Sequence, residues 1–393
     1  MSDRVVIVGA GPAGLVCAAI LARAGHAVVV CEAEPSLPKN LRASTFHPPT
    51  LDMLAEIDVA KAIVAQGLKA PKLQYRDRTT GLIAEFDFGA ISDLTRHPFR
   101  VQCEQYRLNQ AIVETLEHLP NAEIRYGAEV VDIEQHLDHS DALLADGTRI
   151  KGRFIVGADG ANSIVRRASD IPFDGFTWPE RFLVVSTSFD FTEPFPDLCL
   201  VNYFADPEEW YFLLKVPGLW RAMFPARADE DDDAVLSDAS AQRRLNRVFA
   251  RRSPYDIAHK TLYRVHQRVA QSYRSGHCFL AGDAAHINNP LGGMGMNGGI
   301  HDAHNLAHKL ARVLSGDATP TSLDAYERER RPVALEYINT HTIQNKHNLE
   351  TTDPAEQTAF REKLREIQSD SVKTYEYLRR ISMIASLEKA AET

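Results

Sequence analysis

The run Val5-Val6-Ile7-Val8-Gly9-Ala10-Gly11-Pro12-Ala13-Gly14 decides the fold class of this 393-residue chain. Four apolar residues precede the glycine turn, a helical pattern follows as far as Ala24, and a second apolar run, residues 27–31, ends at Glu32. This order predicts a buried parallel strand, a tight turn, a crossover helix and a second parallel strand. We therefore expect a doubly wound α/β domain to begin at the N-terminus.

The glycine turn has the spacing of a dinucleotide-binding site. Its glycines, Gly9, Gly11 and Gly14, permit a tight turn, close approach of the backbone to a pyrophosphate, and close packing of the helix whose N-terminus faces the anion. Ala13 belongs to the same turn and is expected at the cofactor. Glu32 is placed to accept a hydrogen bond from a ribose 2′-hydroxyl, and its charge disfavours a 2′-phosphate. The tightly held nucleotide is therefore expected to be FAD or NAD.

Composition and charge restrict the partners. The chain is 44% hydrophobic and 25% charged, with a formal net charge of −9, so it offers no basic surface overall to a nucleic acid. It has no run of about 18 apolar residues and no signal-peptide pattern. Its five cysteines are scattered without C-x-x-C spacing, which is typical of a reducing compartment. We expect a cytoplasmic protein that binds neither nucleic acid nor a membrane.

Two further segments distinguish FAD from NAD. The first is Gly157-Ala158-Asp159-Gly160, continuing to residue 167, and the second is Gly282-Asp283-Ala284-Ala285-His286, continuing through the glycine-rich residues 290–297. With the glycine turn, these motifs occur in the order seen in single-component FAD-dependent aromatic hydroxylases. The chain resembles this family, the para-hydroxybenzoate hydroxylase-like flavoprotein monooxygenases, over about residues 1–345. Residues 42–50 and 103–107 look most like hydroxyphenylpropionate hydroxylase relatives.

The resemblance implies an α/β fold in which a doubly wound FAD-binding domain of glutathione-reductase type carries an inserted β-sheet substrate domain and C-terminal helices. The expected FAD-binding domain is discontinuous and comprises residues 1–70, 100–178 and 274–345. Residues 71–99 and 179–273 form the expected substrate domain, and residues 346–393 the C-terminal helices. A homodimer is a further expectation.

The resemblance also assigns cofactor residues. Asp159 would serve both FAD and the pyridine nucleotide, Asp283 would bind the ribityl chain, and Arg42 and Arg107 would lie along the flavin. The two aspartates have an alternative interpretation as turn-forming residues. The helix N-terminus after the glycine-rich loop could stabilise negative charge on the reduced flavin. The remaining cofactor contacts are expected at Val131, Gly293, Gly295, Met296 and Asn297.

The activity implied by the resemblance is hydroxylation of a small electron-rich ring, a phenolic acid or a hydroxypyridine. NADH or NADPH would bind transiently and reduce FAD, and reaction with O₂ would give a flavin C4a-hydroperoxide that transfers the hydroxyl group. Three alternatives remain open at this stage: an FAD-dependent oxidase or reductase, a monooxygenase of a larger polycyclic compound, and a non-catalytic flavin-binding protein.

Two residues are candidates for handling the proton of the ring. His47 stands before Pro48-Pro49, and a histidine of ordinary pKa accepts a phenolic proton at neutral pH. Tyr203 corresponds, by comparison with the family's sheet, to a tyrosine that hydrogen-bonds the substrate hydroxyl. Each residue has an alternative interpretation as an ordinary core side chain.

The other substrate contacts are expected on nearby strands. Tyr211, Leu213 and Lys215 share one face of a strand by alternation. Lys215 could pair with a substrate carboxylate or lie at the surface, and Arg181 and Arg221 are rival partners for an anion. The remaining substrate contacts are expected at Met223 and Pro290.

No metal is expected. His301, His304 and His308 lie on one face of a predicted helix, but they span two turns, and no Asp, Glu or Cys close in sequence completes a tetrahedral set. The acidic run from Glu230 to Asp233 is expected to be a solvated loop.

Overall fold

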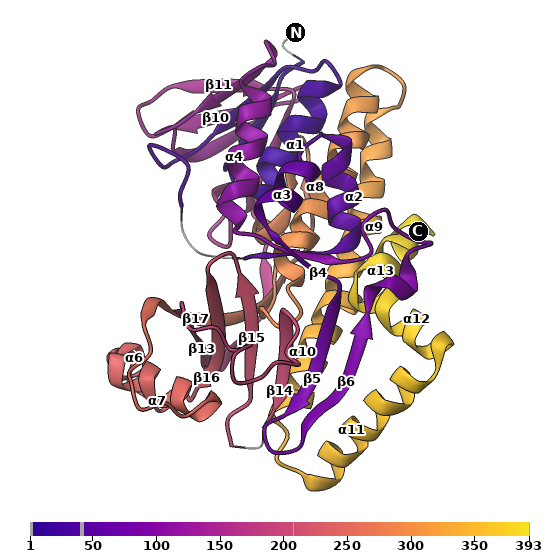
Figure 1. Ribbon diagram of the computed structural model, residues 1–393. Helices are drawn as coiled ribbons and strands as arrows, with labels where there is room; N and C mark the ends of the chain where they lie inside the picture. Colours follow the sequence, from indigo (N-terminus) through magenta and orange to yellow (C-terminus); the bar gives the residue numbers. More distant parts are fainter. Residues whose placement is uncertain (1–2, 40–42, 207, 393) are drawn as a thin grey trace.

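The computed structural model describes residues 3–39, 43–206 and 208–392. Two sheets lie at the centre of two parts of the molecule, one above the other in Figure 1, and the C-terminal helices run along the lower right side. Within the described residues, no helix is both long enough and apolar enough to cross a membrane.

The upper part is built on a six-stranded sheet formed within the described residues. Its order is β18 (Arg274–Ser275), β19 (Cys278–Leu280), β12 (Phe154–Gly157), β1 (Val5–Val8), β2 (Val28–Cys31) and β8 (Ala122–Arg125). All neighbours pair in parallel except β18 and β19. The crossover helix α1 (Pro12–Arg23) packs between α4 (Gln105–Leu116) and α8 (Met294–Leu314). The prediction of a doubly wound α/β domain is therefore confirmed.

Shorter elements surround this sheet. An antiparallel sheet comprises β9 (Val130–Gln135), β10 (Ser140–Leu144) and β11 (Arg149–Gly152). Another joins β3 (Thr45–Phe46), β7 (Arg100–Gln102) and β4 (Leu68–Ala70). The short helices on this side are α2 (Pro48–Glu56), α3 (Ala60–Gln66) and α5 (Ile164–Ala168).

The lower part is an eight-stranded sheet, counted over the same described ranges. Its order is β20 (His286–Ile287), β17 (Ile257–Ala270), β13 (Phe173–Thr187), β16 (Leu219–Ala226), β15 (Tyr211–Val216), β14 (Val201–Ala205), β5 (Lys72–Asp77) and β6 (Gly81–Asp87). Neighbours are antiparallel apart from the parallel pair β14 and β5. Strands separated widely along the chain therefore complete one sheet.

Helices cover this sheet on both faces. Helices α6 (Asp232–Leu236) and α7 (Asp238–Val248) pack on one face, where Leu213, Phe224 and Leu245 share an apolar core. Near β5 and β6, the other face is covered by α10 (Asn339–Glu350), α11 (Pro354–Ser369), α12 (Ser371–Ile381) and α13 (Ile384–Ala391). Helix α9 (Asp324–Pro332) links α8 to this group.

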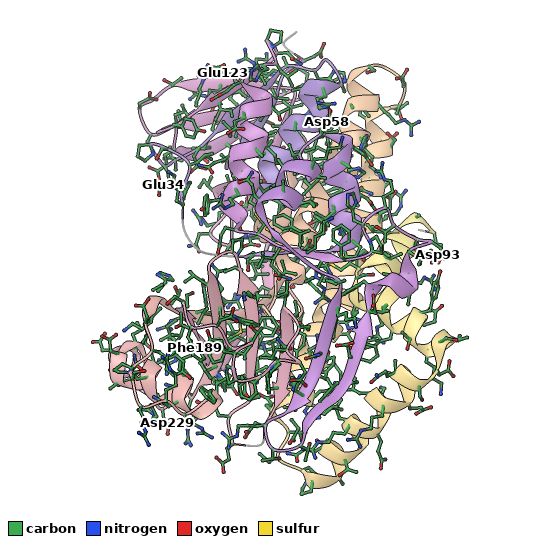
Figure 2. The ribbon with its side chains drawn as sticks, in the orientation of Figure 1. Glu34, Asp58, Asp93, Glu123, Phe189 and Asp229 are labelled. Atoms are coloured by element: carbon green, nitrogen blue, oxygen red, sulfur yellow. The ribbon has the colours of Figure 1, made fainter. Side chains whose placement is uncertain are left out.

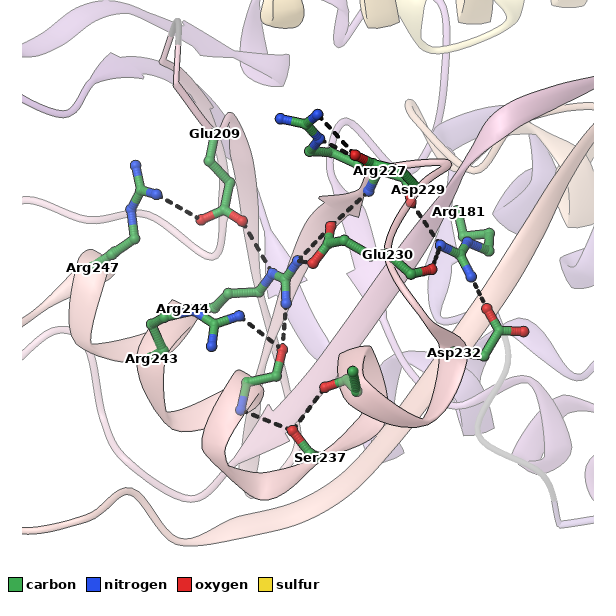
Figure 3. Close-up of polar contacts among 12 residues, drawn as sticks. Arg181, Glu209, Arg227, Asp229, Glu230, Asp232, Ser237, Arg243, Arg244 and Arg247 are labelled. Carbon is green, nitrogen blue, oxygen red and sulfur yellow. Dashed lines mark hydrogen bonds and ion pairs between the residues drawn. The ribbon is translucent and has the colours of Figure 1, made fainter.

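The acidic run from Glu230 to Asp233 continues into the first turn of α6 and is more ordered than a solvated loop. Glu230 accepts a hydrogen bond from Arg244, with Nη2 and Oε2 3.0 Å apart, while Nε of Arg244 lies 3.0 Å from Oε1 of Glu209 (Figure 3). Asp232 pairs with Arg181. The expectation of a solvated loop is corrected because half of the run is helical and Glu230 is held by Arg244, whose side chain is only 4% exposed.

Candidate functional site

One cavity of about 1410 Å³ joins the carboxyl ends of the parallel strands to a face of the eight-stranded sheet. Ligands of open α/β sheets bind at such carboxyl ends. The cofactor residues expected from the sequence that line it are Gly9, Gly11, Ala13, Glu32, Asp159, Asp283, Gly293, Gly295 and Met296. The expected substrate residues Tyr203, Met223 and Pro290 line the same cavity. Motifs far apart in the sequence thus meet at one site.

The three glycines of the turn have distinct steric roles. Gly9 has a φ of +98°, and a Cβ atom there would lie 2.5 Å from the carbonyl oxygen of Ala158. A Cβ atom on Gly14 would lie 2.1 Å from the carbonyl oxygen of Gly9, so the helix packs tightly on the turn. A Cβ atom on Gly11 would meet no atom within 4 Å. Gly11 therefore presents open backbone at the N-terminus of α1, where a pyrophosphate fits.

Glu32 is fixed at the end of β2. Its Oε2 atom accepts a hydrogen bond from the backbone N–H of Ala10 at 2.8 Å, and Oε1 accepts one from the N–H of Glu34 at 3.0 Å. Glu34 also lines the cavity and lies at the left edge of the upper part in Figure 2. The carboxylate of Glu32 is therefore oriented before any ribose binds.

The two aspartate motifs follow β12 and β19. Oδ2 of Asp159 accepts the backbone N–H of Ile164 at 2.7 Å, whereas its buried Oδ1 has no hydrogen-bond partner among the described residues. Burial raises the pKa of Asp159. Asp283 is exposed in the short 3₁₀ turn Gly282–Ala284 and lines the cavity. Asp159 is thus both a turn-forming residue and a residue with a spare buried acceptor.

A buried ion-pair network centred on Asp302 holds the Gly282 turn in place. Asp302 accepts hydrogen bonds from His286 Nε2 at 2.7 Å, from the N–H of Gly282 at 3.3 Å, and from Arg330 Nε at 2.8 Å. Burial alone would raise the pKa of Asp302, but His286 and Arg330 hold it at about 2. The carboxylate therefore stays ionised and positions the turn.

The glycine-rich loop is held by His47 and Asn297. The imidazole Nε2 of His47 donates to the carbonyl oxygen of Gly292 at 2.9 Å, and its backbone N–H donates to Oδ1 of Asn297 at 3.0 Å. Nδ2 of Asn297 donates to the carbonyl oxygens of Thr45 and Gly293, at 2.8 and 2.7 Å. These bonds set the start of α8, whose N-terminal dipole faces the cavity through Gly293, Gly295 and Met296.

His47 itself is not among the residues that line the cavity. It is fully buried, and burial together with the nearby cation Arg100 lowers its pKa well below the ordinary value. The ring is neutral and its Nε2 hydrogen is committed to the loop. The structure therefore places His47 as a positioning residue, where the sequence suggested a proton acceptor.

The strand register arranges the sheet side of the cavity in two rows. One row runs across the sheet through Thr261, Val184, Met223, Phe212 and Tyr203. The second row runs through His259, Ser186, Arg221, Leu214 and Val201. All ten side chains line the cavity because residues in register on antiparallel strands share a face.

Tyr203 lies at the end of the first row. Its ring stacks on Tyr75 with centroids 5.1 Å apart and lies 4.7 Å from Phe212. Among the described residues its hydroxyl has no hydrogen-bond partner, although only 4% of the residue is exposed. This hydroxyl is available to a ligand.

Several expected residues lie elsewhere. Tyr211, Leu213 and Lys215 point to the opposite face: the first two join the core under α6 and α7, and Nζ of Lys215 pairs with Asp190 at 2.7 Å. Phe212 and Leu214 face the cavity instead. The predicted face was therefore wrong by one residue, and a one-residue shift exchanges the two faces of a strand.

Four of the expected cofactor residues lie outside the cavity lining. Val131 is 40% exposed, and its neighbour Val130 lines the cavity. Arg107 donates to Oε1 of Gln66 at 3.0 Å, while Gln105, Tyr106 and Asn109 of the same helix line the cavity. Gly14 and Asn297 shape the turn and the loop from outside the cavity lining. Arg42 lies outside the described residues.

The two rival anion partners are separated by the fold. Arg221 lies in the second row and donates through Nη2 to Glu104 at 2.7 Å. Arg181 donates to the backbone carbonyl oxygens of Arg227 and Glu230, at 2.6 and 2.5 Å, away from the cavity. Of the two, only Arg221 can meet a ligand in this cavity.

Sequence reasoning missed several polar cavity residues. Ser186 and Asn289 carry a buried Oγ and a buried Nδ2 without hydrogen-bond partners among the described residues. Arg100 is buried and lines the cavity as well. The strand register was needed to find Ser186, whereas the position of Asn289 just before the glycine-rich loop was a signal in the sequence itself.

The fold places a carboxylate beside two of the three histidines on the face of α8. Oε2 of Glu56 lies 2.9 Å from Nε2 of His304 and 3.4 Å from Nε2 of His308, whereas the buried His301 meets the hydroxyl of Thr50. Glu56 comes from α2, so its proximity to these histidines could not be predicted from their spacing along the helix, and the expectation of no metal stays a prediction. This group lies outside the cavity lining.

Comparison with known proteins agrees with this site. A family model described as an FAD binding domain matches residues 3–340. The para-nitrophenol 4-monooxygenase of Pseudomonas sp. (strain WBC-3) is 35% identical over 90% of this chain and 89% of its own length. The 6-hydroxy-3-succinoylpyridine 3-monooxygenase of Pseudomonas putida (strain DSM 28022 / S16) is 33% identical over 91% of each chain.

Two further likenesses bear on the fold and the narrower resemblance. The crystal structure of p-nitrophenol 4-monooxygenase from Pseudomonas putida DLL-E4 superposes with a TM-score of 0.91 at 31% identity, covering 98% of this chain and 97% of that one. A 3-(3-hydroxy-phenyl)propionate/3-hydroxycinnamic acid hydroxylase of Mycobacterium sp. (strain JLS) is 32% identical over 86% of this chain and 59% of its own length. The glycine turn, the two aspartate motifs and these matches agree, and the chain belongs to the FAD binding domain family of flavoprotein aromatic monooxygenases.

Proposed function

We propose that this chain is an FAD-dependent monooxygenase that hydroxylates a small phenol or hydroxypyridine, using NADH or NADPH as a transient reductant and O₂ as the oxygen source. The observation that carries the proposal is the single cavity running from the open Gly11 turn to the rows of side chains on the sheet. One end offers a nucleotide site and the other an apolar surface for a ring.

The residues present fit FAD. Gly11 and the N-terminus of α1 would hold the pyrophosphate, and Glu32 would hold the ribose of the adenosine half. The N-terminus of α8, with Gly293, Gly295 and Met296, would lie at the flavin ring. Asp283 would contact the ribityl chain. Bound tightly but non-covalently, FAD supplies hydride acceptance and oxygen activation.

The sheet supplies the ring site. Phe212, Met223 and Val201 offer apolar contacts, and the hydroxyl of Tyr203 would hydrogen-bond the ring hydroxyl. The chain's own contribution is to orient the ring and to exclude water. We also propose that residues 1–70, 100–178 and 274–345 form the FAD-binding domain, and that residues 71–99 and 179–273 form the substrate domain.

The test is oxidation of NADH or NADPH by the purified holoenzyme, with and without candidate phenols and hydroxypyridines. A hydroxylase shows oxidation that the ring compound stimulates and that is coupled to a hydroxylated product. An oxidase forms only hydrogen peroxide whether or not a ring is present, and that result would reject the proposal. Turnover of polycyclic phenols in preference to single rings would reject the proposed substrate class alone.

A further inference from the structure

One buried cation in the cavity has no countercharge from the part of the chain that the structure describes. Arg100 is 2% exposed and lines the cavity from β7. Its Nη2 donates to the carbonyl oxygen of Ile381 at 3.2 Å, its guanidinium lies 5.1 Å from the ring centroid of Phe88, and its buried Nε has no acceptor among the described residues. No carboxylate of the described chain forms an ion pair with it. A guanidinium is always charged and carries five N–H donors. Within the described residues, Arg100 uses one of them in the bond to Ile381, so the others can bind an anion.

Most other buried arginines of the described chain pair with a carboxylate, and Arg166, which has none, donates to the carbonyl oxygens of Ala284 and Ala161 instead. Arg76 pairs with Asp197 at 2.8 Å, and Arg221, which also lines the cavity, pairs with Glu104 at 2.7 Å. Arg330 pairs with Asp302 at 2.8 Å. Burying an arginine without a partner is costly, and here the cavity is the direction from which an anion can arrive.

The surroundings of Arg100 locate that anion beside the ring site. The charge of Arg100 lowers the pKa of Tyr75, Tyr377 and His47. Burial has the larger effect: it raises the pKa of both tyrosines above the ordinary value and lowers that of His47 further. Tyr377 donates its hydroxyl hydrogen to the Tyr75 hydroxyl at 3.1 Å, and Tyr75 stacks on Tyr203. Both tyrosines stay neutral, His47 is neutral, and Glu104 is bound to Arg221. Among residues 3–39, 43–206 and 208–392, no carboxylate therefore pairs with Arg100.

We propose that Arg100 binds the aromatic substrate as its phenolate, by pairing with the ionised ring oxygen near Tyr203. This inference rests on the proposed function for the identity of the ligand. The ring hydroxyl loses its proton to solvent on binding, and the guanidinium compensates the charge that remains on oxygen. The site therefore selects rings whose hydroxyl ionises near neutral pH, and it needs no carboxylate on the substrate.

The first experiment uses the unmodified holoenzyme without reductant and 4-nitrophenol, whose phenolate absorbs at longer wavelength than the neutral phenol. Difference spectra over a pH series give the ionisation state of the bound ligand directly. An opposite charge within about 4–6 Å lowers a pKa by roughly one to three units. Half-ionisation of bound 4-nitrophenol should therefore occur about one to three pH units below that of the free compound. A bound ligand that titrates at or above the free value overturns the proposal.

The second experiment measures the Kd of 4-nitrophenol for Arg100→Gln, Arg100→Lys and the control Arg76→Gln. Arg76 is also buried, but it lies outside the cavity lining, and its partner Asp197 is 60% exposed. Loss of a hydrogen bond to a charged group weakens binding about ten- to a hundredfold. We expect that loss in Arg100→Gln, a smaller one in Arg100→Lys, and unchanged affinity in Arg76→Gln.

The FAD content of Arg100→Gln distinguishes the two anions that Arg100 could bind, the substrate phenolate and the cofactor. If Arg100→Gln loses FAD while the remaining holoenzyme binds the phenolate normally, the partner of Arg100 is the cofactor, and the proposal is wrong. If affinity depends on Arg100 only for phenols that carry a carboxylate, the ionised hydroxyl is not the partner. Phenolate binding without coupled hydroxylation would reject the proposed function and leave the assignment of Arg100 standing.

Discussion

Tyr203 combines a fixed ring with a hydroxyl open to the cavity. Stacking on Tyr75 and contact with Phe212 hold the aromatic plane, so replacing the hydroxyl leaves the packing intact. We expect Tyr203→Phe to slow hydroxylation about ten- to a hundredfold, because the ionised ring oxygen loses its hydrogen bond from the Tyr203 hydroxyl. Stopped-flow measurement of product formation checks this, with FAD content as the control for folding. A wild-type rate and an unchanged pH profile would show that the Tyr203 hydroxyl does not hydrogen-bond the ring oxygen.

Replacing His47 should affect FAD retention, in contrast to the replacement of Tyr203. Because it anchors Gly292, His47→Ala leaves a buried carbonyl without its donor, which costs about 1–3 kcal/mol. We expect weaker FAD retention, measured by dialysis and flavin fluorescence, and no change in the pH dependence of hydroxylation near neutrality. The reason is that the lowered pKa of His47 keeps the ring neutral over that range. A His47→Ala enzyme with full FAD and a shifted pH profile would restore His47 as a proton acceptor.

At the scale of elements, the Asp302 network ties the turn after β19 to helices α8 and α9. Removing one member of a buried ion pair typically costs about 3–5 kcal/mol. Asp302→Asn should lower the free energy of unfolding by that order, measured by urea denaturation. Asp58→Asn is the matched control, since Asp58 pairs with Arg23 at the surface with 74% of its side chain exposed (Figure 2). That change should cost less than about 1 kcal/mol.

The pH dependence of the same variant has a defined sign. The folded pKa of Asp302, about 2, lies below the ordinary value, so its stabilisation is present above about pH 4 and is lost as the pH falls toward 2. Asp302→Asn should therefore lose less stability than the wild type between those values. Parallel acid-denaturation curves for the two proteins would contradict the assignment.

The segments that form strands and helices could be predicted from the sequence, whereas the face of the sheet on which each side chain lies could be predicted only in part. The glycine turn, Glu32 and the Gly282-Asp283 motif identified the cofactor end because backbone geometry there demands particular residues. Strand β15 is apolar on both faces, with Phe212 and Leu214 packing on one side and Leu213 on the other. Alternation alone cannot say which face a distant helix covers, so the register with β16 had to be seen.

Partners that come from distant segments were also beyond sequence reasoning. Glu56 reaches His304 from another helix, and Arg244 reaches Glu230 from beyond the acidic run. Arg100 carries no motif, and its importance follows only from the absence of a carboxylate around it in the described structure. Local patterns predict elements, while such pairings depend on how the elements pack.

On the scale of the whole molecule, the C-terminal helices complete the sheet domain. Leu364 of α11 is 3% exposed and shares an apolar cluster with Tyr75, Phe86 and Tyr203. Leu364→Asp should lower the free energy of unfolding by more than about 3 kcal/mol, because it buries an unpaired charge. Val372→Asp, on a residue 71% exposed in α12, is the control and should be near neutral. Equal denaturation midpoints for both variants would show that α11 does not stabilise the sheet.

The strand order of the upper sheet has a consequence for how the chain is made. Val5 pairs with Phe154, and Ile155 pairs with Cys278, so the first strand gains its second neighbour only once residue 154 has been made, and the sheet is completed only once β19 has been made. Such long-range pairing gives a high contact order and slow folding. A nascent chain carries unpaired strand edges on the ribosome, which are templates for aggregation. The cavity, which is lined by residues from both the N-terminal turn and the Gly282 turn, can thus be completed only after the segment around residue 280 has left the ribosome.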